Sequence, residues 1–233
     1  MGEGREGEQH QGERREAETR LCDRHAGDDR ASGERTAGEE TGRSVTRLTD
    51  PRALRAYAHP VRMKLVGLLR TRGPLTATQA ARLIGESSGT CSFHFRQLAK
   101  YGLVEEAGGG TGREKPWRAI AMYTAWDDVQ DTPEGTAAVS QLLQVAAETQ
   151  VANLMRWLAA REAESAEWRT AAMLGDEYLW LTPAELTELG RQAEALTTRY
   201  ADRLTRPELR PEGARPVSYL HIAFPHIPRD DAP

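Results

Sequence analysis

Apolar residues recur at helical spacing in the middle of the chain, in short runs separated by residues typical of helix ends. Asp50 suits a helix N-cap, and Pro60 interrupts the run that follows it. Gly73, Gly85 and Gly102 close the later runs. The helices expected from this pattern span 51–59, 61–72, 77–85 and 88–101.

Two short runs with β-strand character follow the last of these helices, at 103–106 and 116–121. The connector between them holds four glycines together with Arg113 and Lys115. A basic, glycine-rich hairpin after a set of short helices is typical of a winged helix-turn-helix domain, which we expect over residues 46–122.

The pattern changes after residue 126, where an acidic linker precedes a long run with a wide apolar face. Thr182 and Glu185 have the spacing of a capping box and predict the start of a second long helix. The fold class expected is mainly α with a small β hairpin, in which a C-terminal α+β helical domain over 123–233 follows the winged helix-turn-helix domain. The elements expected in that domain are helices over 136–163 and 183–203 and strands over 178–181 and 216–225.

The first 45 residues consist largely of glycine, glutamate and arginine, and Leu21 and Cys22 are almost their only large apolar side chains. Such a segment buries too little apolar surface to offset the entropy lost on ordering. We therefore expect residues 1–45 to form a disordered tail.

The compartment follows from what the sequence lacks. No run approaches the roughly 18 consecutive apolar residues of a membrane-spanning helix, and the N-terminus has no apolar secretory segment. The two cysteines, Cys22 and Cys91, cannot form a disulfide framework, which favours a reducing compartment. We expect a cytoplasmic protein that does not bind membranes.

Charge is strongly segregated along the chain, although the whole sequence has a net charge of only −4. Residues 47–120 contain 13 basic and 5 acidic side chains, a net charge of +8. The preceding 46 residues have a net charge of −4, and residues 121–233 have one of −8. A compact basic segment between acidic flanks indicates a surface for a polyanion, and double-stranded DNA is the partner we expect.

The predicted helix over 88–101 has two distinct faces. Cys91, Phe95 and Leu98 share one side, at the spacing of a buried face. The other side combines hydroxyl, amide, aromatic and cationic side chains, which suit phosphates and the edges of base pairs. The DNA-binding candidates are Ser88, Thr90, Ser92, Phe93, Arg96, Gln97 and Lys100 on this helix, with Arg113 and Lys115 in the hairpin.

A metal site at Cys91 and His94 is the alternative interpretation of this helix. Structural zinc needs three or four protein ligands, and the helix offers two, three residues apart. We therefore favour Cys91 as a small core residue and His94 as a half-buried one, and expect no metal and no cofactor. Phosphate-binding, serine-hydrolase and zinc-hydrolase motifs are missing, so we expect no catalytic residues and no enzymatic activity.

The stretch GTCSFHFRQLAKYGLVEEAGGGTGREKPWRA, together with the earlier AHPVRMKLVGLL, resembles the recognition helix and wing of ArsR-type winged-helix regulators. The resemblance covers about residues 47–122 and is nearer to the larger members with an extended helical C-terminal part. It implies a homodimer that binds a near-palindromic operator, most often as a repressor. Metal sensors of that family carry paired cysteines on the helix before the recognition helix, and TATQAARLIG has none, so metal sensing is not implied.

Two features leave alternatives open. Phe93 on the outer face also suits a winged-helix module that binds another protein without sequence-specific DNA binding. In the C-terminal half, the long helix over 136–163 is a candidate for dimerisation. Large aromatic and soft side chains there suit either ordinary core or a pocket for an unknown small-molecule effector, namely Trp157, Trp168, Met173, Tyr178, Trp180 and Tyr200.

Overall fold

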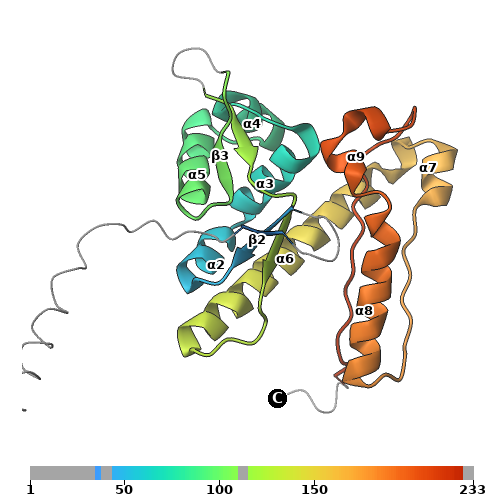
Figure 1. The fold of residues 1–233 in the computed structure, drawn as a ribbon. Helices are drawn as coiled ribbons and strands as arrows, with labels where there is room; N and C mark the ends of the chain where they lie inside the picture. Colours follow the sequence, from blue (N-terminus) through green and yellow to red (C-terminus); the bar gives the residue numbers. More distant parts are fainter. Residues whose placement is uncertain (1–34, 38–43, 110–114, 228–233) are drawn as a thin grey trace, which may run out of the picture. The chain divides into compact units, whose positions relative to one another are not determined.

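The computed structural model describes residues 35–37, 44–109 and 115–227, and it is mainly α-helical with a small β hairpin, as expected (Figure 1). Four helices lie in the order that the apolar pattern predicts, and two short strands follow them as the hairpin. These elements are α2 (Pro51–Tyr57), α3 (Pro60–Arg72), α4 (Ala77–Ile84), α5 (Ser88–Lys100), β3 (Val104–Glu106) and β4 (Trp117–Ala119).

Side chains and glycines at the predicted positions delimit these helices. The Asp50 carboxylate accepts a hydrogen bond from the Arg52 backbone N–H, which caps α2. Thr76 starts α4 with a capping box. Gly85 ends it in the left-handed region at φ 74°, where glycine carries no steric penalty. The short helices are therefore specified locally.

One apolar core joins the helices. Leu54, Leu65 and Val66 of α2 and α3 are fully buried together with Phe95 and Leu98 of α5. Fully burying a side chain of this size contributes about 1.5–3 kcal/mol, so each of these five residues stabilises the domain appreciably.

A long helix extends this core. Helix α6 (Pro133–Ala160) begins at Thr132, whose hydroxyl accepts from the Gly135 backbone N–H at 3.1 Å. Its first turns pack against α2 and α3, and Leu142 is fully buried there. The helix begins three residues before the predicted range because the Thr132-Pro133 pair is an N-cap followed by a proline in the first turn.

A three-stranded sheet lies where no sheet was expected. Strands β1 (Arg35–Ala37), β2 (Ser44–Leu48) and β5 (Tyr123–Trp126) are arranged in the order β1-β2-β5, with β2 parallel to β5 and antiparallel to β1. The segment that composition assigns to a disordered tail contains β1 and the first two residues of β2, 44 and 45. Residues 1–34 and 38–43 lie outside the described part of the chain.

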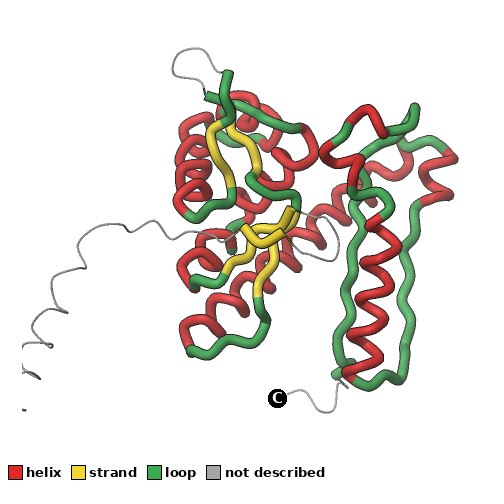
Figure 2. Tube along the Cα trace, in the orientation of Figure 1, coloured by secondary structure: helices red, strands yellow, loops and turns green. Residues whose placement is uncertain are grey.

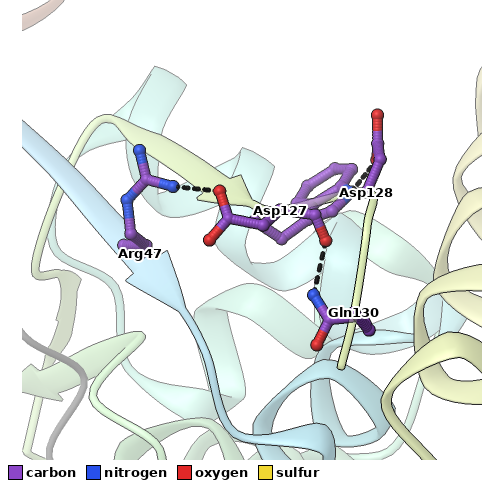
Figure 3. A network of polar contacts seen from close by, with 5 residues as sticks. Arg47, Asp127, Asp128 and Gln130 are labelled. Atoms are coloured by element: carbon purple, nitrogen blue, oxygen red, sulfur yellow. Dashed lines mark hydrogen bonds and ion pairs between the residues drawn. The ribbon is translucent and has the colours of Figure 1, made fainter. Parts of the chain in front are cut away.

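A polar network links this sheet to the segment that leads into α6 (Figure 3). The Arg47 guanidinium pairs with the Asp127 carboxylate at 2.7 Å, and the Gln130 amide donates to the Asp127 backbone carbonyl. The Trp126 indole N–H donates to the Asp128 carboxylate at 3.0 Å. Both members of the ion pair are largely exposed, so it contributes about 0–1 kcal/mol and mainly orients the turn.

After β5 the chain contains helices but no strand within the described residues. The strands predicted over 178–181 and 216–225 are wrong, since both segments are loops (Figure 2). No residue from 143 to 227 is buried, so neither segment has a packed surface or a neighbouring strand to pair with. The helical elements here are η1 (Arg161–Ala163), α7 (Ala166–Ala171), α8 (Pro183–Thr198), α9 (Asp202–Thr205) and η2 (Pro207–Leu209).

Candidate nucleic-acid interface

The turn between α4 and α5 sets the start of the predicted DNA-binding helix. Ser87 is the N-cap of α5, and its hydroxyl accepts from the Thr90 backbone N–H at 3.0 Å. The Ser87 and Thr90 hydroxyls are also hydrogen-bonded to each other at 2.8 Å. The cap therefore satisfies the backbone N–H of Thr90. The remaining N–H groups of the first turn point out of the helix N-terminus, where an anion such as a phosphate binds favourably.

The inner face of α5 is packed as the pattern predicts. Cys91, Phe95 and Leu98 are fully buried, and burial raises the pKa of the Cys91 thiol, which keeps it uncharged. The Phe95 ring stacks on the Trp117 ring with centroids 5.5 Å apart. This packing fixes the rotation of α5 about its axis, and so fixes which side chains face outward.

Trp117 also ties the hairpin to the helices. Its backbone N–H donates to the Leu75 carbonyl at 2.8 Å, and its carbonyl accepts from the Leu75 N–H at 3.0 Å. Sequence reasoning assigned Trp117 to a strand without this role. The sequence feature that indicates this contact is a large aromatic residue at the start of a short strand, because such a side chain is stable when it is packed against a core.

The outer face of α5 presents the predicted DNA-binding side chains. Ser88, Phe93, Arg96 and Lys100 are exposed, and Thr90, Ser92 and Gln97 are partly exposed. Half of the Phe93 surface is accessible. The Arg96 guanidinium donates to the Ser92 hydroxyl at 2.8 Å, and no carboxylate of the described residues pairs with it. One helix thus brings all seven of these candidates together.

The two cations described in the β3–β4 hairpin, the wing, are held in ion pairs. Strands β3 and β4 are antiparallel, with Glu105 opposite Arg118. Lys115 pairs with Glu106 and Arg118 with Glu105, each at 2.7 Å. These exposed pairs are weak in water, so a phosphate can replace the carboxylate as the partner of Lys115. Arg113, the other predicted wing cation, lies outside the described residues.

His94 is buried rather than half-buried, with 7% of its surface exposed. It lies against His59, the N-cap of α3, a contact that sequence reasoning missed. Within the described residues no group of three His, Cys, Asp or Glu side chains could hold a metal ion. The metal interpretation of Cys91 and His94 therefore gains no third ligand from this part of the chain.

The six candidate effector-site residues are not enclosed. Met173, Tyr178 and Trp180 are mostly or fully exposed, and none of the six is buried. They form neither the ordinary core nor a closed pocket in the described structure, so an effector stays a prediction. No helix of the described residues has the length and apolar character needed to cross a membrane.

A family model described as a helix-turn-helix domain matches residues 57–107. The matched range runs from the end of α2 to the end of β3 and includes the whole of α3, α4 and α5. No match was found among the curated proteins. The chain therefore contains a helix-turn-helix domain, which supports DNA binding and a role in transcription regulation.

Proposed function

We propose that this chain is a cytoplasmic, homodimeric transcriptional repressor of the ArsR type, which binds an inverted repeat in double-stranded DNA. The observation that carries the proposal is the outer face of α5, where exposed hydroxyl, aromatic and cationic side chains stand on a helix with a buried inner face. The helix-turn-helix match and the net charge of +8 over residues 47–120 support it.

In this proposal α5 enters the major groove, and five of its outer side chains each contact a particular part of the DNA. Arg96 binds the O6 and N7 atoms of guanine, Gln97 pairs with adenine, and Phe93 contacts a thymine methyl group. Ser88 and the N-terminal backbone of α5 contact a phosphate, as does Lys100 at the other end. The Arg96–Ser92 hydrogen bond holds the guanidinium ready along the helix.

A homodimer is part of the proposal because an inverted repeat requires two recognition helices at a fixed spacing. No catalytic role, metal or cofactor is proposed. Residues 121–233 have a net charge of −8, so DNA repels this half of the chain. In the proposal this half does not contact DNA and instead joins the two copies.

Selection of random and genomic DNA fragments by the purified full-length protein, at near-physiological salt, tests the proposal. We expect one motif with two inverted half-sites whose centres lie about 10 base pairs apart, or a multiple of that distance. Recovery of unselected fragments would contradict sequence-specific binding. A single half-site without a repeat would contradict the dimer.

The assignment of Arg96 is tested separately. Arg96→Ala should cost about 1–3 kcal/mol of discrimination at one base pair and relax the selected motif there. Arg156→Ala, which removes an exposed arginine of α6, is the matched control and should leave the motif unchanged. Equal effects of the two changes would show that Arg96 acts through net charge alone.

A second candidate function has one specific observation in its favour. Leu83 of α4 and Phe93 of α5 are each about half exposed on the helix-turn-helix unit, which also suits a protein-binding module. Such a module would retain no DNA in the selection. Phe93→Ala would then abolish binding of a protein partner and leave DNA retention at its low starting level.

A further inference from the structure

An apolar stripe that runs along α8 and into the turn after it is partly exposed to solvent. Its members alternate at spacings of three and four residues, which are the a and d positions of a heptad pattern. No residue of α8 is buried, and 43–56% of the surface of Leu189, Leu196 and Tyr200 is exposed. A stripe of this kind packs against another helix. The stripe consists of Leu186, Leu189, Ala193, Leu196 and Tyr200.

A glycine beside the stripe indicates that another backbone approaches closely. Gly190 lies in the middle of α8, where glycine is less favourable for a helix than alanine. A Cβ atom added at Gly190 would meet no other atom of the described chain within 4 Å. No contact with the described residues therefore requires glycine here, and the close approach of a second helix to the stripe would account for it.

The charged residues that flank the stripe are acidic at one end of α8 and basic at the other, so the helix is complementary in charge to a second copy of itself. Glu185 and Arg199 occupy g positions at the two ends of the helix, and Gln192 lies midway between them. Hydrogen bonds from the backbone N–H and the hydroxyl of Thr182 to Oε2 of Glu185 lower the pKa of that carboxyl, so it is ionised near neutral pH. We infer that α8 packs antiparallel on α8 of a second copy of this chain.

The antiparallel arrangement pairs the two copies as a twofold axis requires. It sets Glu185 opposite Arg199 of the second copy, twice, and sets the two Gln192 side chains opposite each other at the axis. Leu186 then meets Leu196, and Leu189 meets Ala193. A parallel arrangement would place Glu185 beside a glycine and leave Arg199 without a carboxylate, so charge favours the antiparallel form.

Such an interface presupposes the homodimer proposed above, and it assigns a surface to it. The long helix α6 was the dimerisation candidate from sequence, yet its first half is used against α2 and α3 of its own chain. The contact proposed here is made by a different helix, none of whose stripe residues is buried in the described chain. It requires no DNA, so it can be measured on the free protein.

Disulfide trapping tests the orientation. Gln192→Cys, in full-length protein that also carries Cys22→Ser, should form a dimer on mild oxidation, because the twofold axis brings the two cysteines together. The native Cys91 is fully buried and stays in place. Thr187→Cys, exposed on the side of α8 opposite the stripe, is the matched control and should remain monomeric on a non-reducing gel. Equal crosslinking of the two variants, or crosslinking through Leu189→Cys instead, would overturn the antiparallel contact.

Substitutions that affect helix and dimer differently test the contact itself. Gly190→Ala should increase helicity, since alanine is the better helix former, and yet weaken the dimer by blocking the close approach. Arg199→Glu should weaken the dimer about tenfold or more by placing like charges opposite each other, and adding Glu185→Arg should restore it. Sedimentation of the free protein measures both. A dimer that Gly190→Ala strengthens, or a charge reversal that the second change does not rescue, would contradict the inference.

Leu196→Asp separates this inference from the proposed function. It should yield a monomer, whereas the matched control Ala195→Asp, off the stripe, should remain dimeric. Binding to a DNA half-site by the monomer reports the winged-helix function independently. A Leu196→Asp protein that stays dimeric overturns the α8 contact, whether or not it binds DNA. A wild-type protein that does not bind a DNA half-site overturns the proposed function instead.

Discussion

The imidazole rings of His59 and His94 lie against each other, with centroids 4.7 Å apart and planes tilted by 44°. His94 projects from the inner side of α5 and is buried, and its Nδ1 atom finds no hydrogen-bond partner among the described residues. His59 caps α3, where its Nδ1 accepts from the Val61 backbone N–H at 3.2 Å. The pair therefore joins the start of α3 to α5, the proposed recognition helix.

Acidification should destabilise this domain through the histidine pair. Burial, followed by the positive charge of Arg62, lowers the pKa of both histidines, and the weaker opposing effect of Glu86 does not cancel this. Because the folded-state pKa lies below the ordinary value of about 6.5, the unfolded chain binds protons more readily. The free energy of unfolding should therefore fall as the pH is lowered through 6.5, which urea titrations at a series of pH values measure.

His94→Gln is the control for this pH dependence. Glutamine does not titrate, so the slope between neutral and mildly acidic pH should become shallower, with the contribution of His59 remaining. An unchanged slope in the His94 variant would show that the buried histidine does not control acid sensitivity.

The serine cap of α5 should contribute measurably to stability. Ser87→Ala removes the hydroxyl that accepts from the Thr90 backbone N–H, and we expect a loss of about 0.5–2 kcal/mol in the free energy of unfolding. Ser88→Ala, one residue later and exposed, is the matched control and should change stability by less than about 0.5 kcal/mol. Chemical denaturation of the two variants decides, and equal losses would contradict the assignment of Ser87 as the cap.

Local chemistry explains which elements could be predicted from the sequence. Asp50, Thr76 and Gly85 act on the residues next to them, so the limits of α2 and α4 follow from neighbours in the chain. The inner face of α5 was predictable because Cys91 and Phe95 are one helical turn apart and any helix must bury such a stripe.

Pairing between distant residues explains what could not be predicted. Strand β2 exists because it lies beside β5, with Val45 opposite Tyr123 almost eighty residues later. Nothing in its local composition specifies that neighbour. The strands expected over 178–181 and 216–225 do not form, because these apolar segments have no partner strand within the described chain. The same limit applies to Lys115, whose pairing with Glu106 depends on hairpin register.

Two phenylalanines of α5, two residues apart, should have opposite roles. Phe95 is fully buried and stacked on Trp117, so Phe95→Ala should lower the free energy of unfolding by about 3–5 kcal/mol. Phe93 is half exposed, and Phe93→Ala should cost less than about 1 kcal/mol of stability while weakening binding to the selected DNA. Thermal unfolding and fluorescence anisotropy measure the two effects. Similar stability losses would place Phe93 in the core and remove it from the interface.

The ion pairs of the wing lead to a prediction about salt. In the proposed complex Lys115 exchanges Glu106 for a phosphate, which would release one counterion from the DNA. Lys115→Gln should therefore weaken binding to all sequences alike and reduce the slope of log K against log salt by about 0.9. Anisotropy titrations between about 50 and 200 mM salt measure that slope.

Glu106→Gln distinguishes a phosphate contact of Lys115 from a purely structural ion pair. Removing the carboxylate frees the ammonium group before DNA binds, so affinity should rise and the salt slope should stay at least as steep as in the wild type. A structural role predicts the reverse, because losing either partner would then disturb the hairpin and weaken binding. Parallel losses in Lys115→Gln and Glu106→Gln would therefore remove Lys115 from the DNA interface and leave the contacts to α5 alone.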